Sequence, residues 1–144
     1  MKPGQMRFLV TGATGFIGAN LCNKLVGQGH RVTGLYRNMA NLPPVIPDGI
    51  KFVKGDILNY PGVYEAAGGC DGIFHTAAFT GIGARNHELI RQVIVDGTLN
   101  VIKAAIENGV KKIVITSTAG VLGPSGESPV TEETVRTSGY FIPY

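Results

Sequence analysis

Three glycines at regular intervals follow an apolar run near the start of the chain. Gly12, Gly15 and Gly18 come directly after Phe8-Leu9-Val10, where a strand would turn into a helix. At such a turn the first glycine permits a tight bend, the second lets a diphosphate approach the main chain, and the third lets the helix pack on the strand. The N–H groups and the positive end of the helix dipole would then face the phosphates. The spacing predicts dinucleotide binding; the alternative is a purely structural turn.

The whole segment 11–18 resembles a known family signature. Its G-x-x-G-x-x-G spacing is similar to that of the extended short-chain dehydrogenases/reductases, which include nucleotide-sugar epimerases, dehydratases and dihydroflavonol-type reductases. Segments 55–57, 75–78, 97–100 and 116–120 fit the same resemblance in the same order. The resemblance implies an α/β, doubly wound parallel sheet (Rossmann fold), incomplete because the C-terminal substrate domain is absent. Residues 1–144 would be its NAD(P)-binding domain.

The resemblance also implies a set of cofactor contacts. Asp56 would accept a hydrogen bond from the adenine amino group while Ile57 covers the ring, although Asp56 also suits a plain turn after a strand. Ala77 and Ala78 would let the main chain run beside the cofactor. The implied cofactor-binding residues are Gly12, Thr14, Gly15, Phe16, Ile17, Gly18, Arg37, Asp56, Ile57, Ala77, Ala78 and Thr116.

The end of the second strand bears on the choice of dinucleotide. An acidic residue there would bind the ribose hydroxyls and repel a 2′-phosphate, but the aligned residue is Tyr36, and Arg37 follows it. A guanidinium pairs with a phosphate through two parallel N–H bonds. We therefore expect NADP(H), with NAD as the second choice; the alternative is that Arg37 is an ordinary solvated charge.

Proton transfer in this family uses a tyrosine, a Ser or Thr hydroxyl, and a lysine four residues after the tyrosine, which lowers the pKa of the phenol. The resemblance implies that Thr118 supplies the hydroxyl and that Tyr144 is the tyrosine. Tyr144 lies 26 residues after Thr118 and directly follows a proline. Tyr144 is the last residue of the sequence, so the lysine would lie beyond it. We expect the chain to be part of a longer enzyme and to have little activity alone.

Short β-branched runs alternate with helical patterns, which is typical of repeated βαβ units. Strands are predicted at 6–11, 31–36, 51–54, 72–76 and 111–117. Helices are predicted from residue 17 to about 27 and from 86 to 108. Three prolines in 38–50 argue against a full helix there, and 123–139 is predicted to be a loop. His75 lies on an apolar strand, where a packed core histidine is expected.

Composition excludes several classes of protein. The chain has 144 residues, a net charge of +3 and no long basic run, which argues against a nucleic-acid partner. No apolar stretch is long enough to cross a membrane. Cys22 and Cys70 lack metal-ligand spacing and the histidines are scattered, so no metal site is expected. Because the first residues do not resemble a signal peptide, the chain is predicted to be cytoplasmic.

Three functions remain open. The first is an NADP(H)-dependent oxidoreductase that acts on a carbonyl or alcohol group of a small-molecule substrate. The second is an NAD-dependent nucleotide-sugar epimerase or dehydratase, and the third is a non-catalytic nucleotide-sensing protein. The resemblance also implies a homodimer, because relatives commonly associate through the long helix that holds 97–100.

Overall fold

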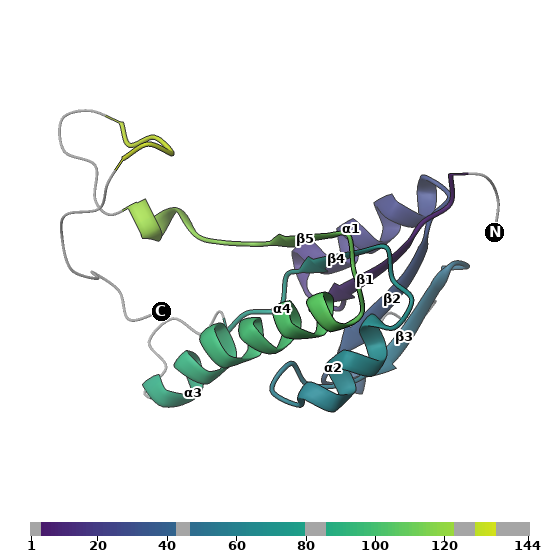
Figure 1. Cartoon of the computed structure of the whole chain (residues 1–144), viewed down its shortest axis with the longest axis horizontal. Helices are drawn as coiled ribbons and strands as arrows, with labels where there is room; N and C mark the ends of the chain where they lie inside the picture. The colour runs from purple at the N-terminus through teal and green to yellow at the C-terminus, as the bar shows by residue number, and fades with distance from the viewer. Residues whose placement is uncertain (1–3, 43–46, 80–85, 123–128, 135–144) are drawn as a thin grey trace.

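A parallel sheet forms the centre of the computed structural model, which describes residues 4–42, 47–79, 86–122 and 129–134 (Figure 1). Its strands are β1 (Arg7–Thr11), β2 (Arg31–Tyr36), β3 (Ile50–Lys54), β4 (Gly72–His75) and β5 (Lys112–Ile115). They lie in the order β3-β2-β1-β4-β5, and every neighbouring pair is parallel. The chain reverses its direction of winding between β1 and β4, which makes this the doubly wound sheet of the Rossmann fold.

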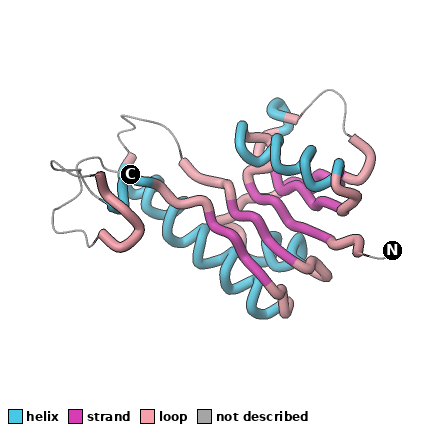
Figure 2. The backbone as a smooth tube through the Cα atoms, turned by 90° about the horizontal axis from the view of Figure 1, so that it is seen from above, coloured by secondary structure: helices cyan, strands magenta, loops and turns pink. Residues whose placement is uncertain are grey.

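Helices cover both faces of the sheet (Figure 2). Helix α1 (Phe16–Gly27) lies on one face; α2 (Tyr60–Ala67) and the long helical segment that begins at His87 lie on the other. Successive strand residues point to opposite faces. Leu9 therefore belongs to the core beneath α2 and the long helical segment, and Val10 belongs to the core beneath α1. The two cores fix the sheet between the helices.

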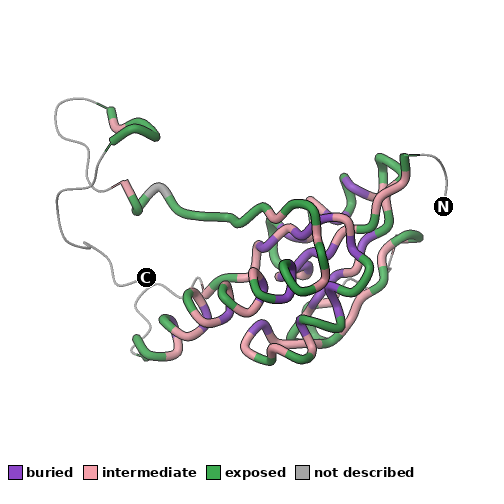
Figure 3. Tube along the Cα trace, viewed as in Figure 1, coloured by how far each residue is buried: buried purple, intermediate pink, exposed green. Residues whose placement is uncertain are grey.

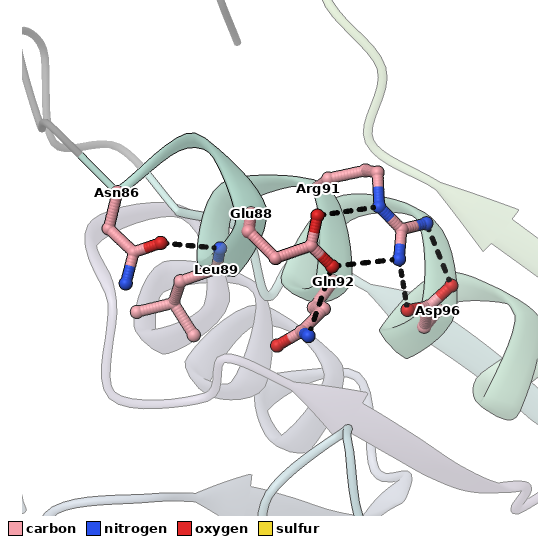
Figure 4. Close-up of polar contacts among 6 residues, drawn as sticks. All are labelled: Asn86, Glu88, Leu89, Arg91, Gln92 and Asp96. Atoms are coloured by element: carbon pink, nitrogen blue, oxygen red, sulfur yellow. Dashed lines mark hydrogen bonds and ion pairs between the residues drawn. The ribbon is translucent and has the colours of Figure 1, made fainter.

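The long helical segment contains a π-helical turn. It consists of α3 (His87–Arg91), the turn η2 (Gln92–Asp96) and α4 (Gly97–Glu107). The N–H of Gly97 donates to the carbonyl of Gln92, five residues back. Figure 4 shows Arg91 between the carboxylates of Glu88 and Asp96, with N···O distances of 3.1 and 3.2 Å. The ion pairs therefore span the junction between α3 and the π-helical turn on its solvent side.

Burial is greatest where the sheet meets the helices, and the described residues from β5 onward are largely exposed (Figure 3). Val114 and Ile115 of β5 are 45% and 38% exposed.

In the described part of the chain, no helix combines the length and apolar character needed to cross a bilayer.

The structure corrects several sequence predictions. Strand β5 ends at Ile115 and not at residue 117, and β4 ends at His75 and not at residue 76. Helix α2 was missed, although Asn59 at its N-cap position and Pro61 in its first turn are helix-start signals. The described part of the proline-containing segment holds the 3-10 turn η1 (Met39–Asn41), in line with the expectation that no full helix forms there.

Candidate cofactor-binding cleft

The glycine turn after β1 is tightly packed on the main chain that leaves β4. Gly12 has φ +67°, and a β-carbon there would lie 2.8 Å from the Cα and N atoms of Ala77. At Gly18 a β-carbon would lie 2.8 Å from the carbonyl carbon of Gly12 and 2.9 Å from Oγ1 of Thr76. Only glycine fits at both positions, so the turn and the helix approach each other as the sequence spacing predicted.

In the described part of the chain, no side chain hydrogen-bonds to the N-terminus of α1 as a cap. Gly15 is the N-cap residue, no side chain caps the helix, and no acidic residue lies in the first turn. Phe16 and Ile17 are 88% and 54% exposed, although both are large and apolar. This helix end therefore offers main-chain donors, a positive dipole and an apolar surface to an anionic ligand.

The helix end lies at the switch point of the sheet. Strands β1 and β4 are neighbours, and their last residues, Thr11 and His75, are partners in the register. In open α/β sheets ligands bind in the crevice outside the carboxyl ends of the strands at this point. The fold therefore places the glycine turn in the position where a dinucleotide binds.

A buried network of hydrogen bonds, here called the histidine network, lies beneath this crevice. Nδ1 of His75 is 2.7 Å from Oγ1 of Thr11, and Nε2 is 3.0 Å from Oγ1 of Thr98. The Thr98 hydroxyl donates to the carbonyl of Ile94 at 2.6 Å, and the N–H of Ala77 donates to Oγ1 of Thr11 at 3.2 Å. The network joins β1, β4 and the long helix.

His75 is neutral in this network. It is 3% exposed, and burial lowers its pKa from 6.5 to about 4, because a charged ring would be desolvated. A ring with both nitrogens engaged inside the core has no access to a substrate, so His75 is a core residue, as expected from the sequence.

Arg37 follows β2 directly and is exposed. Within the described residues it makes no ion pair, whereas the ring of the preceding Tyr36 packs on Phe52 with ring centroids 6.2 Å apart. Tyr36 is thereby held to the sheet and Arg37 extends from the strand end. Its guanidinium is available for an anionic ligand.

Asp56 and Ile57 follow β3 at the same edge of the sheet. Oδ1 of Asp56 accepts a hydrogen bond from the N–H of Leu58 at 3.0 Å, which is the bond of a turn residue. Ile57 is 7% exposed and packs closely on Gly97 of α4. Its side chain thus belongs to the core, so little of it is left to cover an adenine ring.

The remaining predicted site residues lie along the carboxyl edges of β4 and β5. Ala77 is half-buried against Gly12 and Ala78 is exposed. Thr116 and Thr118 are exposed after β5, and Oγ1 of Thr118 accepts a hydrogen bond from the N–H of Gly120 at 3.2 Å. Tyr144 lies outside the described residues.

A cavity of about 230 Å³ lies beside the glycine turn, on the α1 face of the sheet. In the described part of the connection from β2 to β3, the helical element is the short turn η1, and Asn41 and Pro47 of this connection line the cavity together with Phe52 of β3. Its lining is mostly apolar and includes one predicted site residue, Thr14. The lining residues are Ala13, Thr14, Ala19, Cys22, Asn23, Asn41, Pro47, Ile50 and Phe52.

Sequence reasoning missed the parts played by Thr11 and Thr98. Both lie inside segments that the resemblance had marked, but their hydroxyls were given no role. For Thr11 the available signal was a polar residue at the end of an apolar strand, since a buried hydroxyl needs a partner. Thr98 lies in α4 and gave no such signal. The partner, His75, lies 64 residues from Thr11, and only the sheet register brings the two together.

Comparison with known proteins gives the family. The model of the NAD dependent epimerase/dehydratase family matches residues 8–143. The chain is 36% identical over 116 residues to 2-alkyl-3-oxoalkanoate reductase of Stenotrophomonas maltophilia, covering 81% of this chain and 34% of that protein. It is 33% identical over 140 residues to UDP-N-acetyl-alpha-D-glucosaminuronate decarboxylase of Bacillus cytotoxicus, covering 94% and 43%. The chain thus spans less than half the length of these relatives.

Solved structures share the architecture. An epimerase from Methanothermobacter thermautotrophicus superposes with a TM-score of 0.83 and 30% identity, over 97% of this chain and 43% of that one. A UDP-glucose-4-epimerase from Stenotrophomonas maltophila, solved with bound NAD, gives a TM-score of 0.84 and 25% identity, over 97% and 44%. The chain belongs to the NAD dependent epimerase/dehydratase family, among the extended short-chain dehydrogenases/reductases, and carries its Rossmann fold.

Proposed function

We propose that this chain binds NADP(H) across the carboxyl edge of its sheet and is the cofactor-binding part of an oxidoreductase. The observation that carries the proposal is the helix end at Gly15, which has no capping side chain and lies at the switch point between β1 and β4. The exposure of Gly15, Phe16 and Ile17 supports access of a diphosphate to that end.

The preference for NADP(H) over NAD(H) is proposed from Arg37. Its exposed guanidinium follows β2, where a carboxylate would favour NAD(H), and it has the geometry to pair with a 2′-phosphate. Asp56 is proposed to accept from the adenine amino group, because the Leu58 N–H fixes the orientation of its carboxylate. Ile57 would contribute mainly its main chain.

The proposed reaction is hydride transfer to or from a carbonyl or alcohol carbon of a small-molecule substrate. When bound, the nicotinamide supplies or accepts the hydride. The chain would supply a hydroxyl at Thr118 to orient the substrate oxygen and the phenol of Tyr144 to exchange a proton with it, while Thr116, Ala77 and Ala78 line the cofactor. These roles follow from the family pattern and from the position of Thr118 after β5.

Titration with the two cofactors tests this proposal. Arg37→Ala is expected to raise the dissociation constant for NADP(H) about tenfold or more and to change that for NAD(H) little, since a charge-assisted pair is lost only with the phosphate. Arg31→Ala, which removes the same charge at the opposite end of β2, is the matched control. Equal losses for both cofactors in Arg37→Ala would overturn the NADP(H) assignment.

An NAD-dependent epimerase or dehydratase of nucleotide sugars is the second candidate. It is supported by structural neighbours that were solved with NAD, one of them in complex with NAD and UDP. Such an enzyme uses its cofactor transiently. NAD that co-purifies with the protein, together with epimerisation and no net cofactor turnover, would favour it.

A homodimer through the long helix is also proposed. Val95, Leu99 and Ile106 on the outer side of this helix are 43%, 57% and 73% exposed. Exposed apolar side chains on one helix are typical of an association surface.

A cytoplasmic location is proposed on a separate ground, the two buried free cysteines, Cys22 and Cys70.

A further inference from the structure

The directions of the hydrogen bonds in the histidine network follow from two groups, the carbonyl of Ile94 and the neutral, buried ring of His75. A carbonyl oxygen only accepts, so the Thr98 hydroxyl uses its proton on Ile94. The Thr98 oxygen must then accept from Nε2–H of His75. In a neutral ring this leaves Nδ1 as an acceptor, so the Thr11 hydroxyl donates to it.

The far end of the network fits the same direction. Because the Thr11 hydroxyl donates to His75, its oxygen accepts from the N–H of Ala77, as observed. Thr11 also uses its carbonyl, which accepts from the N–H and the hydroxyl of Thr76. Among the described residues no buried side-chain nitrogen or oxygen is left without a partner, so one tautomer satisfies the whole network.

The two ends of the network lie at places of irregular backbone. At one end, the Ala77 main chain lies against Gly12, the positive-φ residue of the glycine turn. At the other end, Ile94 lies inside the π-helical turn η2, where the regular i to i−4 bonding of the helix is interrupted. The Thr98 hydroxyl bonds the Ile94 carbonyl across this turn.

We propose that His75 is a positioning residue of the dinucleotide cleft: its neutral, Nε2-protonated ring ties the glycine turn, through Thr11, to the π-helical turn, through Thr98. The ring itself is buried and touches no ligand. It fixes how close Gly12 lies to Ala77, and therefore the width of the crevice over the β1 and β4 ends. This role rests on the proposed nucleotide function.

The ring nitrogens provide a test on the unmutated chain. The sequence has three histidines, so 15N labelling of histidine gives few ring resonances to assign by NMR. His75 is expected to show a protonated Nε2 and an unprotonated Nδ1 at neutral pH. An Nδ1-protonated tautomer, or a charged ring at pH 7, would overturn the network.

Nucleotide affinity tests the positioning role. Thr98→Val removes the hydroxyl that accepts a hydrogen bond from Nε2–H of His75. The change is expected to raise the dissociation constant for NADP(H) about tenfold, the usual effect of a lost buried hydrogen bond. Thr98→Ser keeps the hydroxyl and should restore affinity. Thr33→Val on β2 is the control, since Thr33 has no side-chain hydrogen bond in the described part of the chain.

Coupling distinguishes positioning from general loss of stability. In a His75→Leu background, Thr98→Val should have no further effect on affinity, because the connection is already broken. Unchanged affinity in Thr98→Val, or equal losses in Thr98→Val and Thr33→Val, would overturn the proposal. If the unmutated chain binds neither cofactor, the proposed function and the positioning role both fail, while the ring shifts still decide the hydrogen-bond directions.

Discussion

Gly18 lies directly against the carbonyl of Gly12, closer than any β-carbon at position 18 would allow. Because the obstructing atoms belong to the main chain, they cannot move aside as a flexible side chain would. The contact holds the first turn of α1 against the bend that leaves β1, and it accounts for the third glycine of the motif.

Gly18→Ala is therefore expected to lower the free energy of unfolding by about 1–3 kcal/mol, the usual cost of overpacking, and to weaken nucleotide binding. Gly27→Ala is the matched control on the same helix. A β-carbon at Gly27 would meet nothing within 4 Å, so this change should be neutral or stabilise by up to about 1 kcal/mol. Equal effects of the two changes on urea denaturation would contradict the packing argument.

Phe16→Glu is expected to separate stability from binding. A carboxylate in the first turn of α1 interacts favourably with the helix dipole, by about 0.3–1 kcal/mol, and Phe16 is too exposed to lose much packing. The same charge should repel a diphosphate and raise the dissociation constant about fivefold at low salt.

Gln28→Glu at the other end of α1 is the control for this charge. It should leave affinity unchanged and lower stability slightly, because it lies at the negative end of the dipole. The comparison needs melting curves and cofactor titrations at two salt concentrations. Unaltered affinity in Phe16→Glu would argue against a diphosphate at this helix end.

Stability should fall as the pH is lowered from about 6.5 to about 4. The pKa of His75 is about 4 in the folded chain against 6.5 ordinarily, so over this range the unfolded state takes up a proton that the folded state does not. The contribution of neutral His75 to the free energy of unfolding is fully present above pH 6.5, and up to roughly 3 kcal/mol of it is lost by pH 4. In His75→Gln the difference between the two pH values should shrink by this amount; an identical pH dependence would show that His75 is not held neutral.

The ion pairs at the π-helical turn should matter little. Arg91, Glu88 and Asp96 have side chains that are 52%, 63% and 44% exposed, and exposed ion pairs contribute about 0–1 kcal/mol. Arg91→Ala should lower the free energy of unfolding by less than about 1 kcal/mol, with the difference vanishing in high salt. Thr98→Val removes a hydrogen bond on the buried side of the same turn. If Arg91→Ala lowered the free energy of unfolding more than Thr98→Val does, the conclusion that the exposed ion pairs contribute little would be wrong.

The fold was predictable from sequence because it depends on local patterns. The β-branched runs and the glycine spacing gave the strands and the start of α1. Helix α2 was missed because it is short and its first turn contains Pro61, although proline is favourable in a first turn. Strand β5 was predicted to be too long because the run of β-branched residues continues from Ile115 into Thr116, whereas the strand ends at Ile115.

The candidate site was predictable only in part. The glycine turn is a feature of consecutive residues and could be recognised directly. The histidine network depends on the register of β1 with β4 and on a helix that follows later in the chain, so it required the structure. Ile57 was assigned to the adenine surface because its position in the motif was known, whereas its direction toward Gly97 was not.

The central claim is that the N-terminus of α1 binds the diphosphate of a dinucleotide. The most direct measurement is titration of the 15N-labelled chain with NADP⁺ while the amide resonances are followed by NMR. The account predicts that the amides of Phe16, Ile17 and Gly18 shift in proportion to saturation, and that those at Gln28 do not. If NADP⁺ and NAD⁺ both leave the first-turn amides unchanged at millimolar concentration, the claim is wrong.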